Sequence, residues 1–248
     1  MKAAFFAYLT ISFVAFGADD FATLMKRGDA LDAKLRTKEA LEVYLEAEKL
    51  DPNNAELLHR IAKQYGESML DVSSKAEKKA LGEKSLAYSK RSVAADSKNA
   101  MAQLALAVSY GRVATYLDNK TKIAYSKLVK EHVDKSIALD PRNDLAWHVL
   151  GVWQYEIANL NSILRAIAGL VYGSIPSASN EDAVKAFKKA LELNPRRVAN
   201  HVELGRTYLA MGKKAEAKAE LEKGLSLPDQ QRDDPDVKQR AREALKKI

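Results

Sequence analysis

Hydrophobic and polar positions along the chain follow the three-to-four-residue period of amphipathic α-helices, and short polar turns separate the periodic stretches. One such turn occurs four times, as KLDPNNA (49–55), AADSKNA (94–100), ALDPRND (138–144) and ELNPRRV (192–198). In each, an apolar or Ala-rich run ends at Asp or Asn, Pro or Ser comes next or soon after, and a new apolar period begins. This order is typical of one helix stopping and the next starting. The pattern predicts a series of helix pairs.

Small and large residues around these turns match the tetratricopeptide pattern, in which small residues stand where two antiparallel helices approach and large ones fill the gaps. Trp147 takes a large-residue position in the fourth unit, and we expect it in the core. The chain is predicted to be an all-α, tetratricopeptide-like α-solenoid of about five helix pairs, forming a single domain over residues 19–248. The matching positions are Gly28, Leu31, Ala40, Tyr44, Ala47 and Pro52 in the first unit, Trp147, Leu150, Gly151, Tyr155, Ala183, Phe187, Ala190 and Pro195 in the fourth, and Leu204, Gly205, Tyr208, Ala217, Leu221 and Gly224 in the fifth.

The repeats are longer than the standard unit of about 34 residues. The turns are 45, 44 and 54 residues apart, measured between Pro52, Ser97, Pro141 and Pro195. The first two excesses are close to three helical turns, so the second and third units are predicted to have elongated helices. A capping box of Ser74 and Glu77 would start one of them. The charged residues 234–247 are predicted to form a C-terminal capping helix.

The fourth unit holds an apolar insert in which Arg165 is the only charge. A helix here would have no clear polar face, so protein, ligand or membrane must cover it. It is too short to span a bilayer. The apolar residues of the insert are Ile163, Leu164, Ile167, Leu170, Val171 and Tyr172.

Residues 1–18 have one charge, Lys2, followed by an apolar run that ends in small residues, as in a secretory signal peptide. We expect this segment to be removed and the chain to be exported, to the periplasm or outside the cell, with no stable membrane span left. The alternative is an uncleaved N-terminus that anchors the chain in a membrane.

Composition and motifs give no sign of catalysis. The 40 Lys and Arg exceed the 33 Asp and Glu by seven, but the two signs are interleaved, so no nucleic-acid partner is expected. The absence of Cys removes disulfides, thiolate metal sites and Cys nucleophiles. The histidines lack metal-ligand spacing, and no nucleotide-binding or hydrolase motif occurs. We therefore predict a non-enzymatic binding protein without a metal or cofactor.

The first helix of each pair is expected to line the concave side of the solenoid. Its exposed positions there look apolar, which suits either a groove that holds a lipid, an acyl chain or another apolar small molecule, or a groove that the insert fills. The predicted groove residues are Met101, Leu104, Val108, Leu145, His148, Val152, Tyr155, Val202, Arg206 and Leu209.

A second hypothesis is a protein-interaction scaffold with a basic outer face. Such a face would bind an acidic partner, such as a tubulin tail, or an anionic membrane surface. Its lysines would be Lys75, Lys78, Lys79, Lys84, Lys120, Lys122, Lys127 and Lys130.

Three C-terminal stretches, HVLGVWQYEIANLN, LRAIAGLVYGSIPSASNEDAVKAFKKALELNP and HVELGRTYLAMGKKAEAKAELEKGLSLP, resemble the regulator of microtubule dynamics family, including its long insert. The stretch IAYSKLVKEHVDKSIALDPRNDLAWHVLG (123–151) is also similar, and the resemblance covers about residues 20–248. It implies an all-helical, tetratricopeptide-like domain without catalysis, in a family with microtubule-associated members and one phospholipid-binding member. With the N-terminal segment, it indicates an exported, bacterial member.

Overall fold

The described residues, 20–174 and 176–248 of a computed structural model, form only helices as regular elements, as the sequence predicts. The expected signal peptide, residues 1–18, lies outside them. The α-helices are α1 (Phe21–Asp32), α2 (Thr37–Leu50), α3 (Ala55–Ser68), α4 (Lys75–Ala95), α5 (Ala100–Ala114), α6 (Asn119–Leu139), α7 (Asp144–Ala158), α8 (Ser162–Tyr172), α9 (Asn180–Leu193), α10 (Val198–Ala210), α11 (Lys214–Ser226) and α12 (Asp234–Leu245), with a short 3₁₀ turn, η1 (Met69–Asp71).

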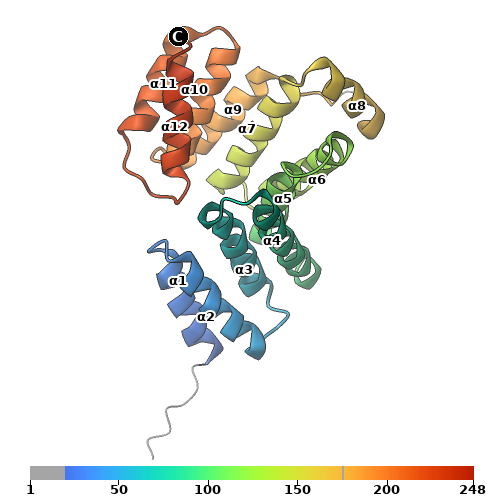
Figure 1. The fold of residues 1–248 in the computed structure, drawn as a ribbon, viewed down its shortest axis with the longest axis vertical. Coiled ribbons are helices and arrows are strands. Elements are labelled where there is room, and N and C mark those ends of the chain that lie inside the picture. The colour runs from blue at the N-terminus through green and yellow to red at the C-terminus, as the bar shows by residue number, and fades with distance from the viewer. Residues whose placement is uncertain (1–19, 175) are drawn as a thin grey trace, which may run out of the picture.

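The helices pack as the five predicted pairs: α1 with α2, α3 with α4, α5 with α6, α7 with α9, and α10 with α11. α12 covers the last pair as the predicted capping helix (Figure 1). α4 and α6 have 21 residues each, while their partners α3 and α5 have 14 and 15. The predicted elongated helices are therefore present in the second and third units.

In three of the four recurring turns, an asparagine caps the new helix. Asn54 accepts a hydrogen bond from the backbone N–H of Leu57 at 3.1 Å, and Asn99 accepts one from Ala102 at 3.0 Å. Asn143 caps α7 in the same way. These side chains satisfy N–H groups that have no partner inside the helix, so the Asn sets where α3, α5 and α7 begin. The fourth turn has Arg197 at this position, and its side chain makes no capping hydrogen bond to α10.

Trp147 is not in the core, contrary to the sequence prediction. It lies in the first turn of α7, partly exposed, and its indole Nε1 donates a hydrogen bond to the backbone O of Pro141 at 2.9 Å. The ring therefore stays over the preceding turn instead of entering the interface of α7 and α9. Trp153 takes the core position: it is 5% exposed and donates to the backbone O of Ser126.

The apolar insert forms α8 and lies on the outside of the solenoid, beside α6 (Figure 1). Ala168 is buried, and the hydroxyls of Tyr172 and Ser126 are hydrogen-bonded at 2.8 Å. Because α7 pairs with α9, α8 loops out of that pair and rests on the neighbouring unit. The hypothesis that the insert fills the concave groove is therefore wrong.

A single arginine joins the two ends of the solenoid. Arg232, just before α12, donates hydrogen bonds to Thr37 Oγ1 at 2.9 Å and to the backbone O of Glu67 at 3.4 Å, and it forms an ion pair with Asp71. We call these contacts the Arg232 clasp. The clasp brings the segment before α12 across the concave side, against the first two units (Figure 1).

Candidate functional site

A cavity of about 530 Å³ lies on the concave side, within the size range of small-molecule sites. Side chains of α1, α3, α5, α7 and α10, together with the clasp segment 231–234, form its walls. Five apolar lining residues, from α5 and α7, are Met101, Leu104, Ala105, Val108 and Leu145, and the charged lining residues are Asp29, Asp32, Glu56, Arg60, Lys63, Glu67, Arg112, Arg197, Asp233 and Asp234. We call these five apolar residues the floor of the groove.

Half of the predicted groove residues line this cavity. They are Met101, Leu104, Val108, Leu145 and His148.

The other five lie elsewhere. Val152, Tyr155 and Leu209 pack against the core cluster around Phe187, and Arg206 pairs with Glu203 at 2.6 Å. Val202 is fully buried against Leu221 and Val237, so its assignment to the groove is wrong. The reason is that α12 packs on α10 and covers the face that would otherwise be open.

The groove carries more charge than the sequence reasoning expected. The predicted groove residues all belong to the third, fourth and fifth units, whereas most of the charged residues that line the groove belong to α1 and α3. Asp29 and Asp32, like Arg60 and Lys63, stand three residues apart and therefore share a helix face. This spacing of charged residues in the sequence is the signal that predicts a charged wall of the groove.

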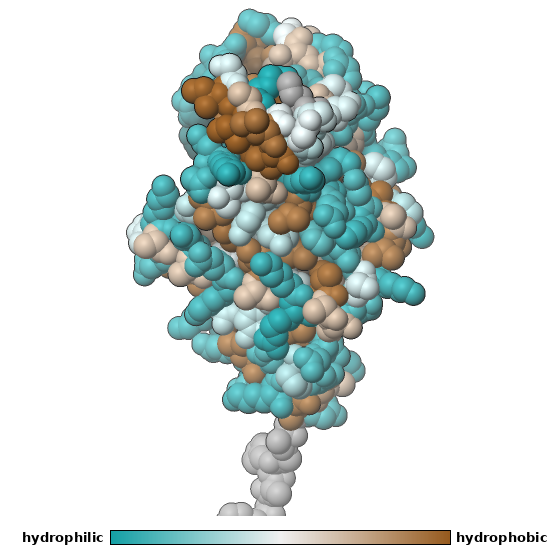
Figure 2. All heavy atoms as spheres, turned by 90° about the vertical axis from the view of Figure 1, so that its right-hand side faces the viewer, coloured by the Kyte–Doolittle hydropathy of each residue, from teal (hydrophilic) through white to brown (hydrophobic). Residues whose placement is uncertain are grey.

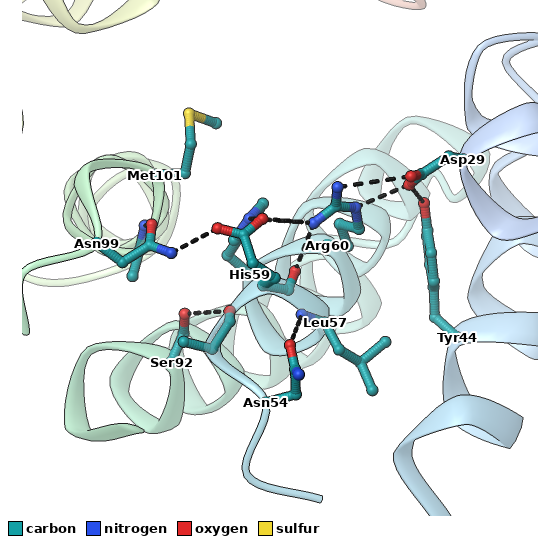
Figure 3. A network of polar contacts seen from close by, with 12 residues as sticks. Asp29, Tyr44, Asn54, Leu57, His59, Arg60, Ser92, Asn99 and Met101 are labelled. Carbon is teal, nitrogen blue, oxygen red and sulfur yellow. Dashed lines mark hydrogen bonds and ion pairs between the residues drawn. The ribbon is translucent and has the colours of Figure 1, made fainter. Parts of the chain in front are cut away.

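One polar network links the first two units at the edge of the groove. Arg60 Nε donates to Asp29 at 2.7 Å, and the Tyr44 hydroxyl donates to the same carboxylate at 2.6 Å (Figure 3). Arg60 Nη1 and Asn99 Nδ2 both donate to Glu56. Partial burial alone would raise the pKa of Glu56, but hydrogen bonds from Arg60, Asn99 and His59 lower it to about 2.

Further ion pairs fix the rim on both sides of the floor. Lys63 Nζ lies 2.7 Å from Asp32, and on the opposite side Arg197 Nε donates to Asp144 at 2.6 Å. These pairs place both signs of charge around an apolar floor. The arrangement suits a ligand that is itself both charged and apolar.

Arg112, on α5, is a cation in the wall of the groove that has unused hydrogen-bond donors. In the part of the chain that the structure describes, its guanidinium makes no hydrogen bond and no ion pair. Burial lowers its pKa, while Glu67 and Asp233 attract it from a distance. A Cβ at Gly66 would lie 1.8 Å from Nη1, so the absent side chain of Gly66 makes room for the guanidinium.

The predicted basic outer face is only partly free. Lys79 pairs with Glu83 and Lys130 with Asp134, on their own helices. Lys75, Lys84, Lys120, Lys122 and Lys127 are exposed. Among the described residues, no group of three His, Asp or Glu side chains could hold a metal ion. No described helix is long and apolar enough to cross a membrane.

A family model described as Regulator of microtubule dynamics protein 1-3 matches residues 24–248. The chain belongs to this family. It is 31% identical to regulator of microtubule dynamics protein 1 of Mus musculus, over 79% of this chain and 65% of that one. It is 27% identical to protein 3 of Bos taurus, over 88% of this chain and 47% of that one. The chain thus spans less than two thirds of the length of these relatives.

The fold has a solved counterpart in a thermophilic TPR protein of Thermus thermophilus. The two match with a TM-score of 0.65 at 20% identity, over 91% of this chain and 98% of that one. This likeness shows the fold and agrees with the tetratricopeptide pattern of the sequence.

Proposed function

We propose that the concave groove binds a segment of a partner protein, with a carboxylate of that segment on Arg112 and its apolar side chains on the floor. The observation that carries this proposal is the Arg112 guanidinium, which lines the cavity and has no hydrogen-bonding partner among the described residues. The guanidinium is partly exposed where it lines the cavity, and a carboxylate with two oxygens matches its fork of donors.

The rim supports a polypeptide ligand. Carboxylates at Asp29, Asp32 and Asp233 stand beside cations at Lys63 and Arg197. A peptide carries both signs of charge along its length and can complement such a rim, whereas a lipid headgroup places its charge at one point.

A second candidate is a lipid, with its phosphate on Arg112 and an acyl chain on the floor. The row formed by Leu104, Val108 and Leu145 favours it, because an apolar strip of this kind suits a hydrocarbon chain. The acidic rim residues weigh against it, since they repel a phosphate.

The test is selection of peptides on the full chain, followed by titration calorimetry with the parent and Arg112→Gln. We expect the selected peptides to be acidic and partly apolar, and Arg112→Gln to bind them about tenfold more weakly or worse. Arg91→Gln is the matched control, because Arg91 pairs with Glu48 and is not a lining residue of the groove. Equal affinities for all three proteins would refute the role of Arg112.

Mass spectrometry of the native protein separates the two ligand classes. A bound phospholipid that Val108→Asp removes, together with no selected peptide, would establish the second candidate instead. The names of the relatives refer to microtubule dynamics, so cosedimentation with microtubules belongs in the same series. Binding lost only when the exposed lysines of the outer face become glutamines would favour the scaffold with a basic outer face.

A further inference from the structure

The strongest feature outside the groove is an apolar stripe on the outer side of α8. Leu170 is 85% exposed and Ile163 is 67% exposed. Ala166 is also exposed and Ile167 is partly exposed, and their spacing places all four on one side of the helix. Figure 2 shows a hydrophobic patch in the upper part of this face, with hydrophilic surface along part of its edge. We call these four residues the α8 stripe.

The opposite side of α8 is already used for packing. Ala168 is fully buried, and Tyr172 reaches Ser126 of α6. The stripe therefore does not result from a loosely placed helix, because the inner side is anchored on α6 and the outer side is left to face outward. Two leucine-sized aliphatic side chains next to each other in water are unfavourable unless something covers them.

Cations border the stripe. Lys127 lies against Tyr172 at the end of α8, with Nζ 5.8 Å from the ring centroid. Lys122 stands one helical turn before Ser126, on the same side of α6. Arg165 is also exposed on α8, but its spacing places it on the side away from the stripe, where Nη2 donates to the backbone O of Ala158 at 3.2 Å. Neither lysine forms an ion pair with a described residue.

The carboxylates of α6 nearest in sequence do not cancel this charge. Asp134 pairs with Lys130 at 2.5 Å, and Glu131 pairs with Lys135 at 2.7 Å. Asp118 is used as the N-cap of α6, where it accepts from the backbone N–H of Thr121. The neighbouring part of α6 therefore keeps a positive charge from Lys122 and Lys127.

We propose that the α8 stripe docks on an anionic membrane surface, inserting Ile163 and Leu170 among the lipid headgroups while Lys122 and Lys127 contact lipid phosphates and carboxylates. This combination of a short apolar helix face with basic neighbours is how peripheral proteins bind bilayers without crossing them. It is independent of the groove and of what the groove binds.

A second copy of the chain fits the stripe less well. A stable dimer buries about 800 Å² on each partner, which four side chains of an 11-residue helix cannot supply. Two stripes facing each other would also bring their cations together. A protein partner would be expected to meet aromatic or arginine anchors, and the stripe is aliphatic.

The experiment is flotation of the full chain with vesicles of phosphatidylcholine and phosphatidylserine, and with vesicles of phosphatidylcholine alone. We expect binding to the anionic vesicles, weakened about tenfold or more by Ile163→Ser with Leu170→Ser. Removing the charges of Lys122 and Lys127 with Gln should weaken binding about fivefold for each lysine. Salt should weaken it as well.

The matched control is Leu50→Ser with Leu139→Ser, which removes two other exposed leucines, 55% and 43% exposed, away from α8. It should bind like the parent. Every variant keeps residues 1–19, so any membrane affinity of that segment is common to all of them. The thermal melt of the serine variant should match that of the parent, and Leu170→Ser alone replaces it if it does not.

Three results would overturn the proposal. One is a serine variant that binds anionic vesicles as tightly as the parent, and another is a parent that binds neither kind of vesicle. The third is a concentration-dependent dimer in sedimentation velocity that the serine variant abolishes, because it would assign the stripe to a second copy.

Discussion

At the scale of single residues, one position, four residues before the Asp or Asn of each recurring turn, is fully buried in every case. It is occupied by either alanine or serine. Ala47 and Ala190 hold it in the first and fourth units, and Ser92 and Ser136 hold it in the second and third. The Ser92 hydroxyl donates to the backbone O of Ala55 at 2.8 Å, and Ser136 donates to Ala100 at 2.9 Å. A buried hydroxyl is tolerated here because its partner is an N-terminal carbonyl of the paired helix.

The two tryptophans of α7 should differ in what they contribute to stability. Trp153→Ala removes a core side chain that is 5% exposed, and we expect it to lower the free energy of unfolding by about 3 to 5 kcal/mol. Trp147→Ala removes a partly exposed ring and one hydrogen bond, so its cost should be smaller, about 1 to 2 kcal/mol. Urea unfolding of both variants measures the difference, and equal losses would contradict the two placements.

Stability should fall in mild acid because of histidines in the groove. Burial lowers the pKa of His148, and likewise the pKa of His59. Each of these histidines then binds a proton near pH 6.5 in the unfolded chain but only at lower pH in the folded chain. The free energy of unfolding therefore decreases as the pH falls below about 6.5, by at most about 1.4 kcal/mol per pH unit for each histidine.

His148→Gln isolates one of these contributions. The difference in unfolding free energy between pH 7 and pH 5 should be smaller for the variant than for the parent, since carboxylates contribute to both proteins alike. Urea unfolding at the two pH values measures it. An unchanged difference would mean that His148 is protonated equally in the folded and unfolded chains.

At the scale of helices, the first, fourth and fifth pairs each place a glycine against a large side chain of the partner helix. A Cβ at Gly28 would lie 2.3 Å from the Tyr44 ring, and one at Gly151 would lie 2.6 Å from the Phe187 ring. Both rings are fully buried and have no free space to move into. Glycine is therefore required at these two positions by the close approach of the helices.

Gly151→Ala should lower the free energy of unfolding by about 1 to 3 kcal/mol, because overpacking exceeds the gain in helix propensity. Gly111→Ala is the control, also inside a helix but with Val129 Cγ2 as the nearest atom at 3.9 Å. It should raise stability by up to about 1 kcal/mol. Thermal or urea unfolding gives both signs, and destabilisation of equal size at the two positions would show that packing at Gly151 is not the cause.

The sequence was sufficient for the features that are set locally. The recurring turns, the Ser74 cap and the long α4 and α6 all follow from residues close together in the chain, and the structure contains each of them. The place of α8 and the burial of Val202 depend on distant helices, α6 and α12, that no local pattern reveals. The charged rim of the groove likewise depends on pairs such as Lys63 with Asp32, which join different helices.

At the scale of the whole molecule, the extensive helix contacts of the described residues run only between neighbouring units. The Arg232 clasp is different, because it links Arg232 to Thr37, which lies 195 residues earlier in the chain, and to Asp71, which lies 161 residues earlier. The segment that carries it also supplies Gln231, Asp233 and Asp234 to the cavity wall. The width of the groove is therefore tied to the clasp.

Arg232→Ala should open the solenoid without unfolding it. Asp71 is exposed, and an ion pair of this kind contributes about 1 kcal/mol or less to stability, so the melting temperature should change little. The two ends of the chain lose their direct link, so the radius of gyration measured by small-angle X-ray scattering should increase. High salt should produce part of the same increase in the parent, because it screens the ion pair.

Arg91→Ala serves as the control for this prediction. Arg91 forms an ion pair with Glu48 at 2.6 Å and donates to the backbone O of Pro52, so it links only the first two units. Its removal deletes a comparable surface pair and should leave the radius of gyration as in the parent. If Arg232→Ala scatters like Arg91→Ala, the shape of the solenoid is held by the packing of neighbouring helices alone, and the clasp does not set the width of the groove.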